Sequence, residues 1–147
     1  MENMSDIVWS INPNNDDLSK VITKIQVFAI EILESKNIEL KMDIPSIPDK
    51  IEINLDQRRH FHMICKEAFN NIAKYSKADM ATFSILLKNQ RIYTVISDNG
   101  VGFHSMVQGD GNGLVNMRSR IADLGGKIHI DSGADNGTII EFDFPIT

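Results

Sequence analysis

Four runs of alternating apolar and polar residues in the second half of the chain constrain its fold most. Residues 80–88 and 91–98 are separated only by an Asn-Gln pair and predict a β-hairpin. Residues 126–133 and 137–145 predict a second hairpin. In its last strand the apolar and acidic residues alternate, so one set faces the core and the other faces outward. The inward set is Ile140, Phe142 and Phe144, and the outward set is Glu141 and Asp143.

The first half of the chain has mainly helical periodicity. A short helix is expected up to about Ile11, because Pro13 and its predecessor disfavour an uninterrupted helix. A second helix, capped by an aspartate at position 16 or 17, is expected to run to about Asn37. Residues 38–45, "IELKMDIP", then alternate like a half-buried strand that stops at its proline.

Two more helices are expected around the hairpins. Residues 55–75 place Phe61, Ile64, Ala68 and Ile72 on one face. The last helix covers about 113–124 and stops at a Gly-Gly pair, since glycine favours helix ends.

Composition excludes several classes of protein. The formal net charge of −5 and the scattered Lys and Arg residues do not supply the basic patch of a nucleic-acid-binding protein. Cys65 is the single cysteine, so no intrachain disulfide forms, and its helical context predicts a small core residue. No apolar stretch approaches the roughly 18 residues of a membrane span, so we expect one soluble domain without direct membrane contact.

A polar stripe follows the helix at 55–75. Glu67, Asn71 and Lys74 are spaced by four and then three residues, which lines up a carboxylate, an amide and an ammonium. A carboxamide oxygen can hold Mg²⁺ together with substrate phosphates, and a lysine one turn on can meet those phosphates. On these residues alone, a solvated helix face remains the alternative.

Five glycines lie within residues 96–120, between a strand and a helix. Asp98 ends the strand, where its carboxylate can accept a hydrogen bond from an exocyclic amine, and Gly100 and Gly102 let the backbone approach a flat ring. The same residue types also build ordinary turns. Asn116 occupies the third glycine position of a dinucleotide fingerprint, so that motif fails. A glycine-rich helix start still offers free amides to an anion, and phosphate is the natural occupant.

In this order the motifs closely resemble the ATP-binding domain shared by gyrase, heat-shock chaperone, histidine kinase and MutL ATPases, the GHKL superfamily. "KEAFNNIAKYSKA" resembles its asparagine box, "DNGVGF" and "GNGLVNMRSRI" its two glycine boxes, and "NGTIIEFDFP" its terminal Gly-Thr strand. The resemblance implies an α+β, two-layer sandwich (the Bergerat ATP-binding fold), with a mixed, mostly antiparallel sheet covered by helices on one face.

The resemblance is narrower still to the catalytic domain of a bacterial two-component sensor histidine kinase. The "GLVNMRSR" helix points to the subgroup whose response regulators carry LuxR-like (NarL-type) DNA-binding domains. It implies that residues 1–35 are the end of a dimerisation helix and a linker helix, and that residues 36–147 form the catalytic domain. The implied cofactors are ATP and Mg²⁺.

The resemblance also implies roles for single residues. Asn71 coordinates Mg²⁺, Lys74 contacts phosphate and Asp98 recognises the adenine amine. Glu67 has a metal-shell or positioning role within this catalytic group. The other residues implied to bind ATP shape the pocket and a lid at 103–112, with the last one supporting the base through water: Gly100, Gly102, Gly111, Gly113, Leu114 and Thr138.

A histidine kinase needs an acceptor histidine on a dimerisation helix, and none of the four histidines fits. His60 and His62 lie on the helix that bears the site, His104 lies in the expected lid and His129 alternates on a strand. The implied partners are therefore a dimerisation and phosphoacceptor domain of the same kinase, absent from this chain, and a response regulator. The implied location is cytoplasmic, within a kinase anchored in a membrane.

Two alternatives stay open at this stage. The first is a serine kinase of the anti-sigma type, against which the linker-like "IVWSINP" argues. The second is a nucleotide-binding interaction module without transfer activity.

Overall fold

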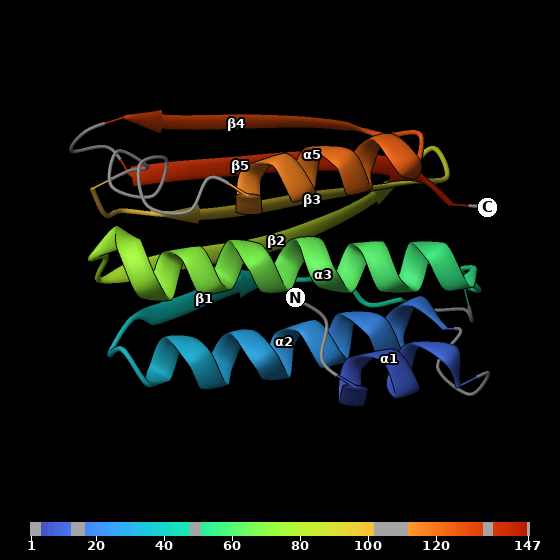
Figure 1. The fold of residues 1–147 in the computed structure, drawn as a ribbon, viewed down its shortest axis with the longest axis horizontal. Helices are drawn as coiled ribbons and strands as arrows, with labels where there is room; N and C mark the ends of the chain where they lie inside the picture. Colours follow the sequence, from blue (N-terminus) through green and yellow to red (C-terminus); the bar gives the residue numbers. More distant parts are fainter. Residues whose placement is uncertain (1–3, 13–16, 48–50, 102–111, 134–136, 147) are drawn as a thin grey trace.

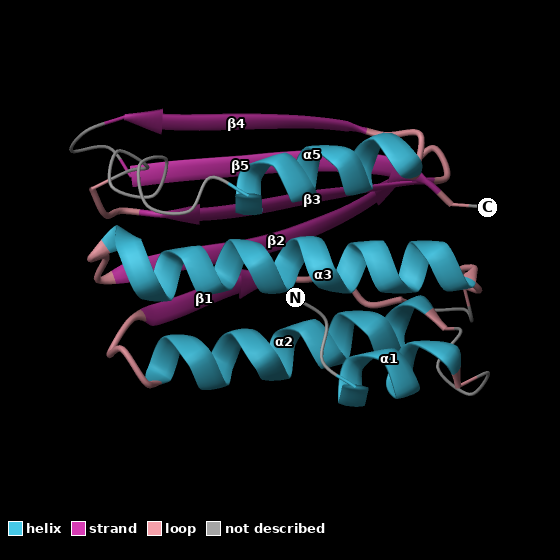
Figure 2. Cartoon of the chain, in the orientation of Figure 1, coloured by secondary structure: helices cyan, strands magenta, loops and turns pink. Residues whose placement is uncertain are grey.

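The computed structural model describes the chain except for residues 1–3, 13–16, 48–50, 102–111, 134–136 and 147. A layer of helices covers one face of a five-stranded sheet (Figures 1 and 2). The strands are β1 (Glu39–Asp43), β2 (Met80–Lys88), β3 (Arg91–Asp98), β4 (Lys127–Gly133) and β5 (Gly137–Pro145). The helices are α1 (Met4–Ile11), α2 (Leu18–Glu34), α3 (Leu55–Asn71), the π-helix η2 (Ile72–Ser76) and α5 (Asn112–Asp123).

The strand order across the sheet is β1-β2-β3-β5-β4. β1 is parallel to β2, and the other neighbouring pairs are antiparallel, so the sheet is mixed and mostly antiparallel as expected. Both predicted hairpins are confirmed. At the β2–β3 turn, Asn89 and Gln90 both have left-handed backbones, with φ of 53° and 61°. Positive φ at both central residues is the turn geometry that matches the twist of paired strands.

One hydrophobic core lies between the helices and the sheet. Phe61 of α3 is fully buried, and its ring meets the ring of Phe144 edge-on at a centroid distance of 5.3 Å. Phe69 meets Phe83 of β2 in the same way, also at 5.3 Å. Cys65 is buried between these two contacts on α3, which confirms it as a core residue. The aromatic pairs fix α3 along the middle of the sheet.

Helix ends follow the local sequence. The Asp17 side chain caps α2 by accepting from the Ser19 amide at 3.0 Å, as predicted. Asn54 and Gln57 form a reciprocal capping box at the start of α3. α2 ends at Glu34, three residues earlier than predicted, because the chain turns there and Asn37 adopts a left-handed φ of 59°.

The end of the third helix differs from the prediction. The α-helical pattern stops at Asn71, and Ile72–Ser76 form a π-helix that ends at Lys77, whose φ is 54°. A π-helix has a wider turn, with hydrogen bonds from residue i to i+5. The regular spacing used to align Lys74 with Glu67 and Asn71 therefore does not apply beyond Asn71.

α2 contributes buried residues to the same core as α3 and the sheet, among them Leu18, Ile25 and Leu33. The division of the chain near residue 35 stays a prediction. Among the described residues, none of the helices is both long enough and apolar enough to cross a membrane.

Candidate functional site

The end of β3 carries a buried acid of the predicted site. Asp98 is only 8% exposed and lies opposite Thr138 in the β3–β5 pairing. Its Oδ1 accepts a hydrogen bond from the Gly100 amide at 2.7 Å. Burial raises the pKa of Asp98, and hydrogen bonds from the Gly100 and Thr138 backbones offset part of that rise. A buried carboxylate with spare acceptor capacity at a strand end is suited to a ligand that donates.

The loop after Asp98 is fastened to the end of the helix η2. The Val101 amide donates to the Ser76 carbonyl at 2.7 Å. Gly100 lies against the same carbonyl so closely that a Cβ at this position would overlap it. The loop therefore requires glycine at position 100.

Asn99 and Ser132 were not singled out from the sequence. The Asn99 Oδ1 accepts from the amides of Asp79 and Met80, both at 3.0 Å, and so ties the loop to the start of β2. Asp79 and Met80 are 20 and 19 residues away from Asn99 in the chain, so a local turn motif does not reveal this contact. Ser132 of β4 lies opposite Thr138, with 3.1 Å between their hydroxyl oxygens, and only the strand register reveals that contact.

The polar residues of α3 lie in different environments. Asn71 is 8% exposed, and its Nδ2 has no hydrogen-bond partner among the described residues. Glu67 is half-buried, whereas Lys74 on η2 is exposed. Because buried amide groups are nearly always hydrogen-bonded, the unpaired Asn71 amide indicates a site that a ligand or water completes.

Glu67 reaches from α3 to the first turn of α5. Its Oε1 occupies the space that a Cβ on Gly113 would fill, so the carboxylate lies against the amino end of that helix. The position is electrostatically favourable, because a helix amino terminus attracts negative charge. Leu114 follows and packs against the hydrophobic core, which anchors the helix.

Two groups of predicted site residues are thus brought together. Asp98, Gly100 and Thr138 are joined by hydrogen bonds, and Glu67 meets Gly113. The ends of α3 and β3 and the start of β5 all lie at the left end of the molecule in Figure 1. Gly102, Gly111, His104 and residues 103–111 of the expected lid lie outside the described residues, whereas Asn112 begins α5.

The oxygen atoms of the candidate site suit a metal ion that takes most of its ligands from a bound substrate. Among the described residues there is no cluster of three or more His, Cys, Asp or Glu side chains that could hold a metal by itself. Mg²⁺ typically takes one or two protein oxygens and completes its shell with phosphates and water. The buried Asn71 carboxamide and the nearby Glu67 carboxylate on the same helix match that requirement.

Comparison with known proteins assigns the family. The model of the family described as histidine kinase-, DNA gyrase B- and HSP90-like ATPases matches residues 56–147, more than half of the chain. The chain belongs to this ATPase family. The match includes every predicted site residue from Glu67 to Thr138.

Sensor histidine kinases are among the proteins that the chain resembles. The chain is 35% identical over 88 residues to the oxygen sensor histidine kinase NreB of Staphylococcus carnosus, covering 58% of this chain and 25% of that protein. It is 31% identical over 113 residues to the histidine-protein kinase/phosphatase UhpB of Salmonella typhimurium, covering 77% of this chain and 22% of that protein. The chain thus spans about a quarter of the length of these curated relatives.

Solved structures show the same fold at low sequence identity. The catalytic domain of histidine kinase ThkA superposes with a TM-score of 0.69 at 18% identity, covering 89% of this chain and 93% of that one. Full-length ShkA in complex with AMPPNP gives a TM-score of 0.71 at 17% identity, covering 89% of this chain and 30% of that one. The α+β fold is therefore that of histidine kinase catalytic domains.

Proposed function

We propose that this chain is the ATP-binding catalytic domain of a sensor histidine kinase. It binds Mg²⁺-ATP between the end of α3, the loop after β3 and the start of α5. The family assignment supports ATP as the ligand. The single observation that carries the site is the Nδ2 donor of buried Asn71, which has no partner among the described residues and can therefore donate to an acceptor on a ligand, such as a phosphate oxygen.

Each part of the nucleotide has a matching group. Asp98 accepts from the adenine amine, and Thr138 lies beside it across the β3–β5 pair. Asn71 would hold Mg²⁺ through its carboxamide oxygen, and the ion would neutralise negative charge on the phosphates. Lys74 supplies a positive charge to the phosphates. The amino end of α5, against which the Glu67 carboxylate already lies, partly offsets the negative charge of both groups. Glu67 has a positioning role, because its carboxylate lies between the metal-binding helix and α5.

The reaction is transfer of the γ-phosphoryl group to a histidine on a dimerisation domain outside this chain. Catalysis of such a transfer rests on positioning and electrostatic stabilisation, with no covalent intermediate on this domain. His62 is 3% exposed and packs beside the Trp9 ring, so it is not placed to be the acceptor. The phosphohistidine would then supply a response regulator, and a regulator of the LuxR-like (NarL) type stays a prediction from the sequence.

Residues 1–12 are proposed to be the tail of the dimerisation helix, and α2 the linker helix that continues into the catalytic core. Placement on the cytoplasmic side of a membrane-anchored kinase stays a prediction.

Isothermal titration with Mg²⁺-ATP tests the binding site. At a protein concentration of about 100 μM even a weak complex gives measurable heat. Asn71→Ala is expected to lose the Mg²⁺ dependence of binding, whereas Asn70→Ala, the same change one residue earlier on α3, is expected to bind like the parent. Absence of heat with the parent chain refutes the proposed function.

Phosphoryl transfer separates this function from the two alternatives. The chain is expected not to label itself with phosphate from ATP. It is expected to phosphorylate a separately supplied dimerisation fragment of its own kinase, but slowly, because two separate chains lack the high effective concentration that a covalent linker provides. Label that is lost in acid identifies phosphohistidine. Acid-stable self-labelling would instead support a serine kinase, and ATP binding without any transfer would support an interaction module.

A further inference from the structure

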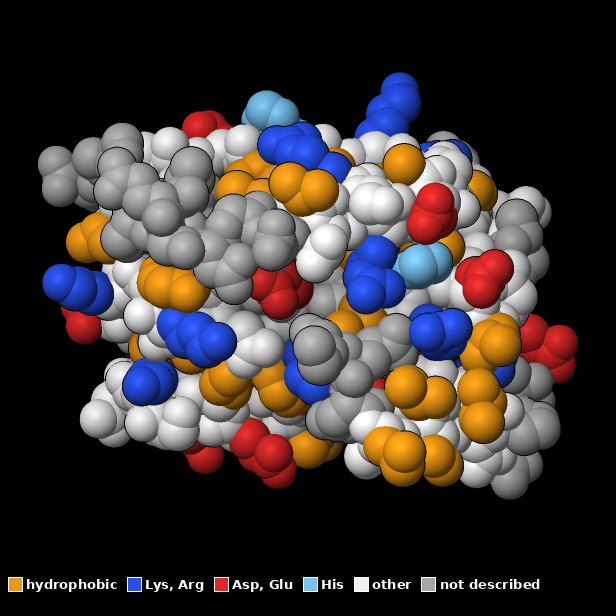
Figure 3. Space-filling model, in the orientation of Figure 1, with side chains coloured by type: hydrophobic (Ala, Val, Ile, Leu, Met, Phe, Trp, Pro, Cys, Tyr) orange, Lys and Arg blue, Asp and Glu red, His pale blue; other side chains and the backbone are white. Residues whose placement is uncertain are grey.

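The first helix of the chain has its apolar residues on the wrong side for core packing. Met4, Ile7, Val8 and Ile11 of α1 are between 40% and 80% exposed. The two buried residues of the same helix are Asp6 and Ser10. Figure 3 shows hydrophobic side chains gathered on the surface over α1, at the lower right. Burial of apolar surface, which normally attaches a helix to its domain, therefore contributes little here.

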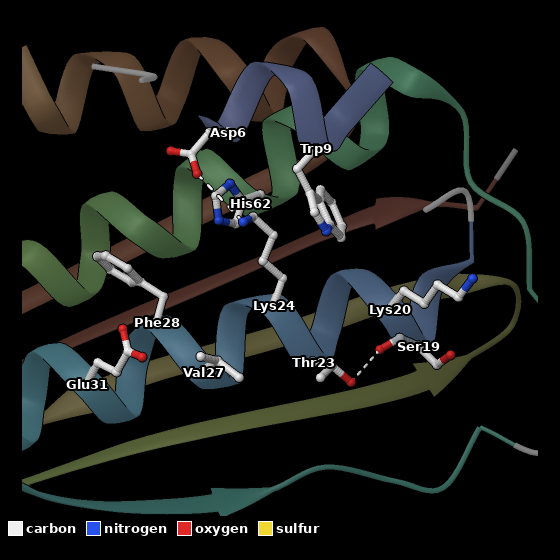
Figure 4. A pocket seen from close by; sticks show the side chains of 10 residues that line it. All are labelled: Asp6, Trp9, Ser19, Lys20, Thr23, Lys24, Val27, Phe28, Glu31 and His62. Carbon is white, nitrogen blue, oxygen red and sulfur yellow. Dashed lines mark hydrogen bonds and ion pairs between the residues drawn. The ribbon is translucent and has the colours of Figure 1, made fainter. Parts of the chain in front are cut away.

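Charged groups surround Asp6 instead. Its Oδ2 accepts from the Lys66 ammonium on α3 at 2.5 Å, and its Oδ1 lies 3.8 Å from the Lys24 ammonium on α2. Asp6 and Lys66 side chains are only 8% and 15% exposed, so water screens their attraction weakly. Figure 4 shows Lys24 rising from α2 toward Asp6 and His62.

A second polar contact holds the carboxyl end of α1. Arg58 of α3 donates to the Ser10 carbonyl through Nε at 3.0 Å and through Nη2 at 2.8 Å. The guanidinium is 7% exposed and also donates to the Ile53 carbonyl at 2.9 Å. A cation at the last carbonyls of a helix complements the helix dipole. Arg58 thus caps α1 from a different helix.

Between α1 and α2 lies a cavity of about 530 Å³. Trp9 of α1 lines it, half-buried, with the Lys24 ammonium 5.1 Å from its ring centroid. Beside this aromatic contact the helix has no buried apolar side chain. The interface of α1 is therefore mostly polar, and it contains an open space rather than close packing.

We infer that α1 is a detachable arm, held on the domain mainly by the polar contacts of Asp6 with Lys66 and of Ser10 with Arg58. The partly buried Trp9 adds an apolar contact with the core. The rest of the fold is expected to stay intact when the arm leaves, because every fully buried core residue lies outside α1. α3 carries both the arm's partners and the residues Glu67 and Asn71. Release of the arm thus changes the surroundings of the helix that bears the proposed site. The inference itself is independent of nucleotide binding.

The test uses Lys66→Met and Asp6→Ala in the whole chain, with hydrogen exchange followed residue by residue. A hydrogen bond to a charged group corresponds to about 10- to 100-fold in a local equilibrium. Exchange of the α1 amides is expected to accelerate by about that factor, while amides of α3 and the sheet keep the rates of the parent. Trp9 is the single tryptophan, so acrylamide quenching of its fluorescence is expected to rise in parallel.

Matched controls are Lys41→Met and Asp43→Ala, which make the same charge changes at exposed positions of β1. Both are expected to leave α1 exchange and Trp9 quenching unchanged. Two results overturn the inference. If α1 amides stay as protected as in the parent in both variants, polar contacts do not hold the arm. If α3 and the sheet lose protection together with α1, the helix is an integral part of the fold.

Discussion

Replacing Asp98 by Asn removes one charge and one acceptor from the proposed base-binding site while keeping the shape of the side chain. Asn keeps one oxygen, which can still accept from the Gly100 amide at the position now 2.7 Å away. Its NH₂ group then stands where the second carboxylate oxygen was. That group donates, so it opposes the adenine amine.

The effects on folding and on binding differ in size. The charge of Asp98 is costly to bury, as the raised pKa shows, so losing it offsets the loss of a hydrogen bond. We expect the free energy of unfolding to change by no more than about 1 kcal/mol. Binding instead leaves a buried donor of the ligand unpaired, at about 1–3 kcal/mol, which corresponds to roughly 5- to 150-fold in Kd.

The assay is isothermal titration of parent and Asp98→Asn with ATP and with GTP, alongside urea unfolding. Asp131→Asn, an exposed aspartate on β4, controls for the change in net charge. The affinity for ATP is expected to fall more than the affinity for GTP, because the new NH₂ group can donate to the guanine carbonyl. If the variant binds both nucleotides as the parent does, Asp98 is a turn residue and the proposed base recognition is wrong.

Three further predictions concern the contacts of Gly100, Asp98 and Asp6. Gly100→Ala is expected to displace the loop after β3 and weaken ATP binding at least tenfold in titration, because its Cβ would overlap the Ser76 carbonyl. Protonation of Asp98 removes the acceptor for the adenine amine, so the affinity for ATP is expected to fall as the pH decreases. Because burial raises the pKa of Asp98, this loss should begin at a higher pH than for an ordinary aspartate. Titration with ATP across pH 4–7 checks this. For Asp6, burial alone would raise the pKa, but the Lys66 hydrogen bond and the charges of His62, Lys66 and Lys24 outweigh it and lower the pKa. Its stabilisation of α1 is thus complete above pH of about 4 and is lost as pH falls through the lowered pKa, which Trp9 quenching would show.

Most of the fold was predictable because each helix or strand shows its own periodic pattern of apolar and polar residues within one segment of the sequence. Both hairpins and the long helices came from alternation or helical spacing, and the cap at Asp17 from residue type. α1 was predicted as a helix, but its inverted orientation was not. Its sequence gives no sign that Asp6 meets Lys66, a contact 60 residues away in the chain.

The site was predictable where a short motif contains its own contacts. Asp98 and Gly100 bond to each other two residues apart. In contrast, Ser132 meets Thr138 only through strand register, and Glu67 meets Gly113 only through the packing of α3 against α5. Contacts of these kinds depend on the assembled fold, so local sequence patterns do not reveal them.

The π-helix at the end of α3 connects these observations. The Ser76 hydroxyl donates to the Ile72 carbonyl at 2.7 Å and accepts from the Ala78 amide at 3.1 Å, which fixes the last turn by its own side chain. The Ser76 carbonyl is then the acceptor for Val101 and the surface on which Gly100 rests. π-helical turns have poorer geometry than α-helices and occur frequently at functional sites. Here the wider turn joins the helix of Asn71 to the loop of Asp98, so the same backbone contacts position the proposed metal-binding and base-binding residues relative to each other.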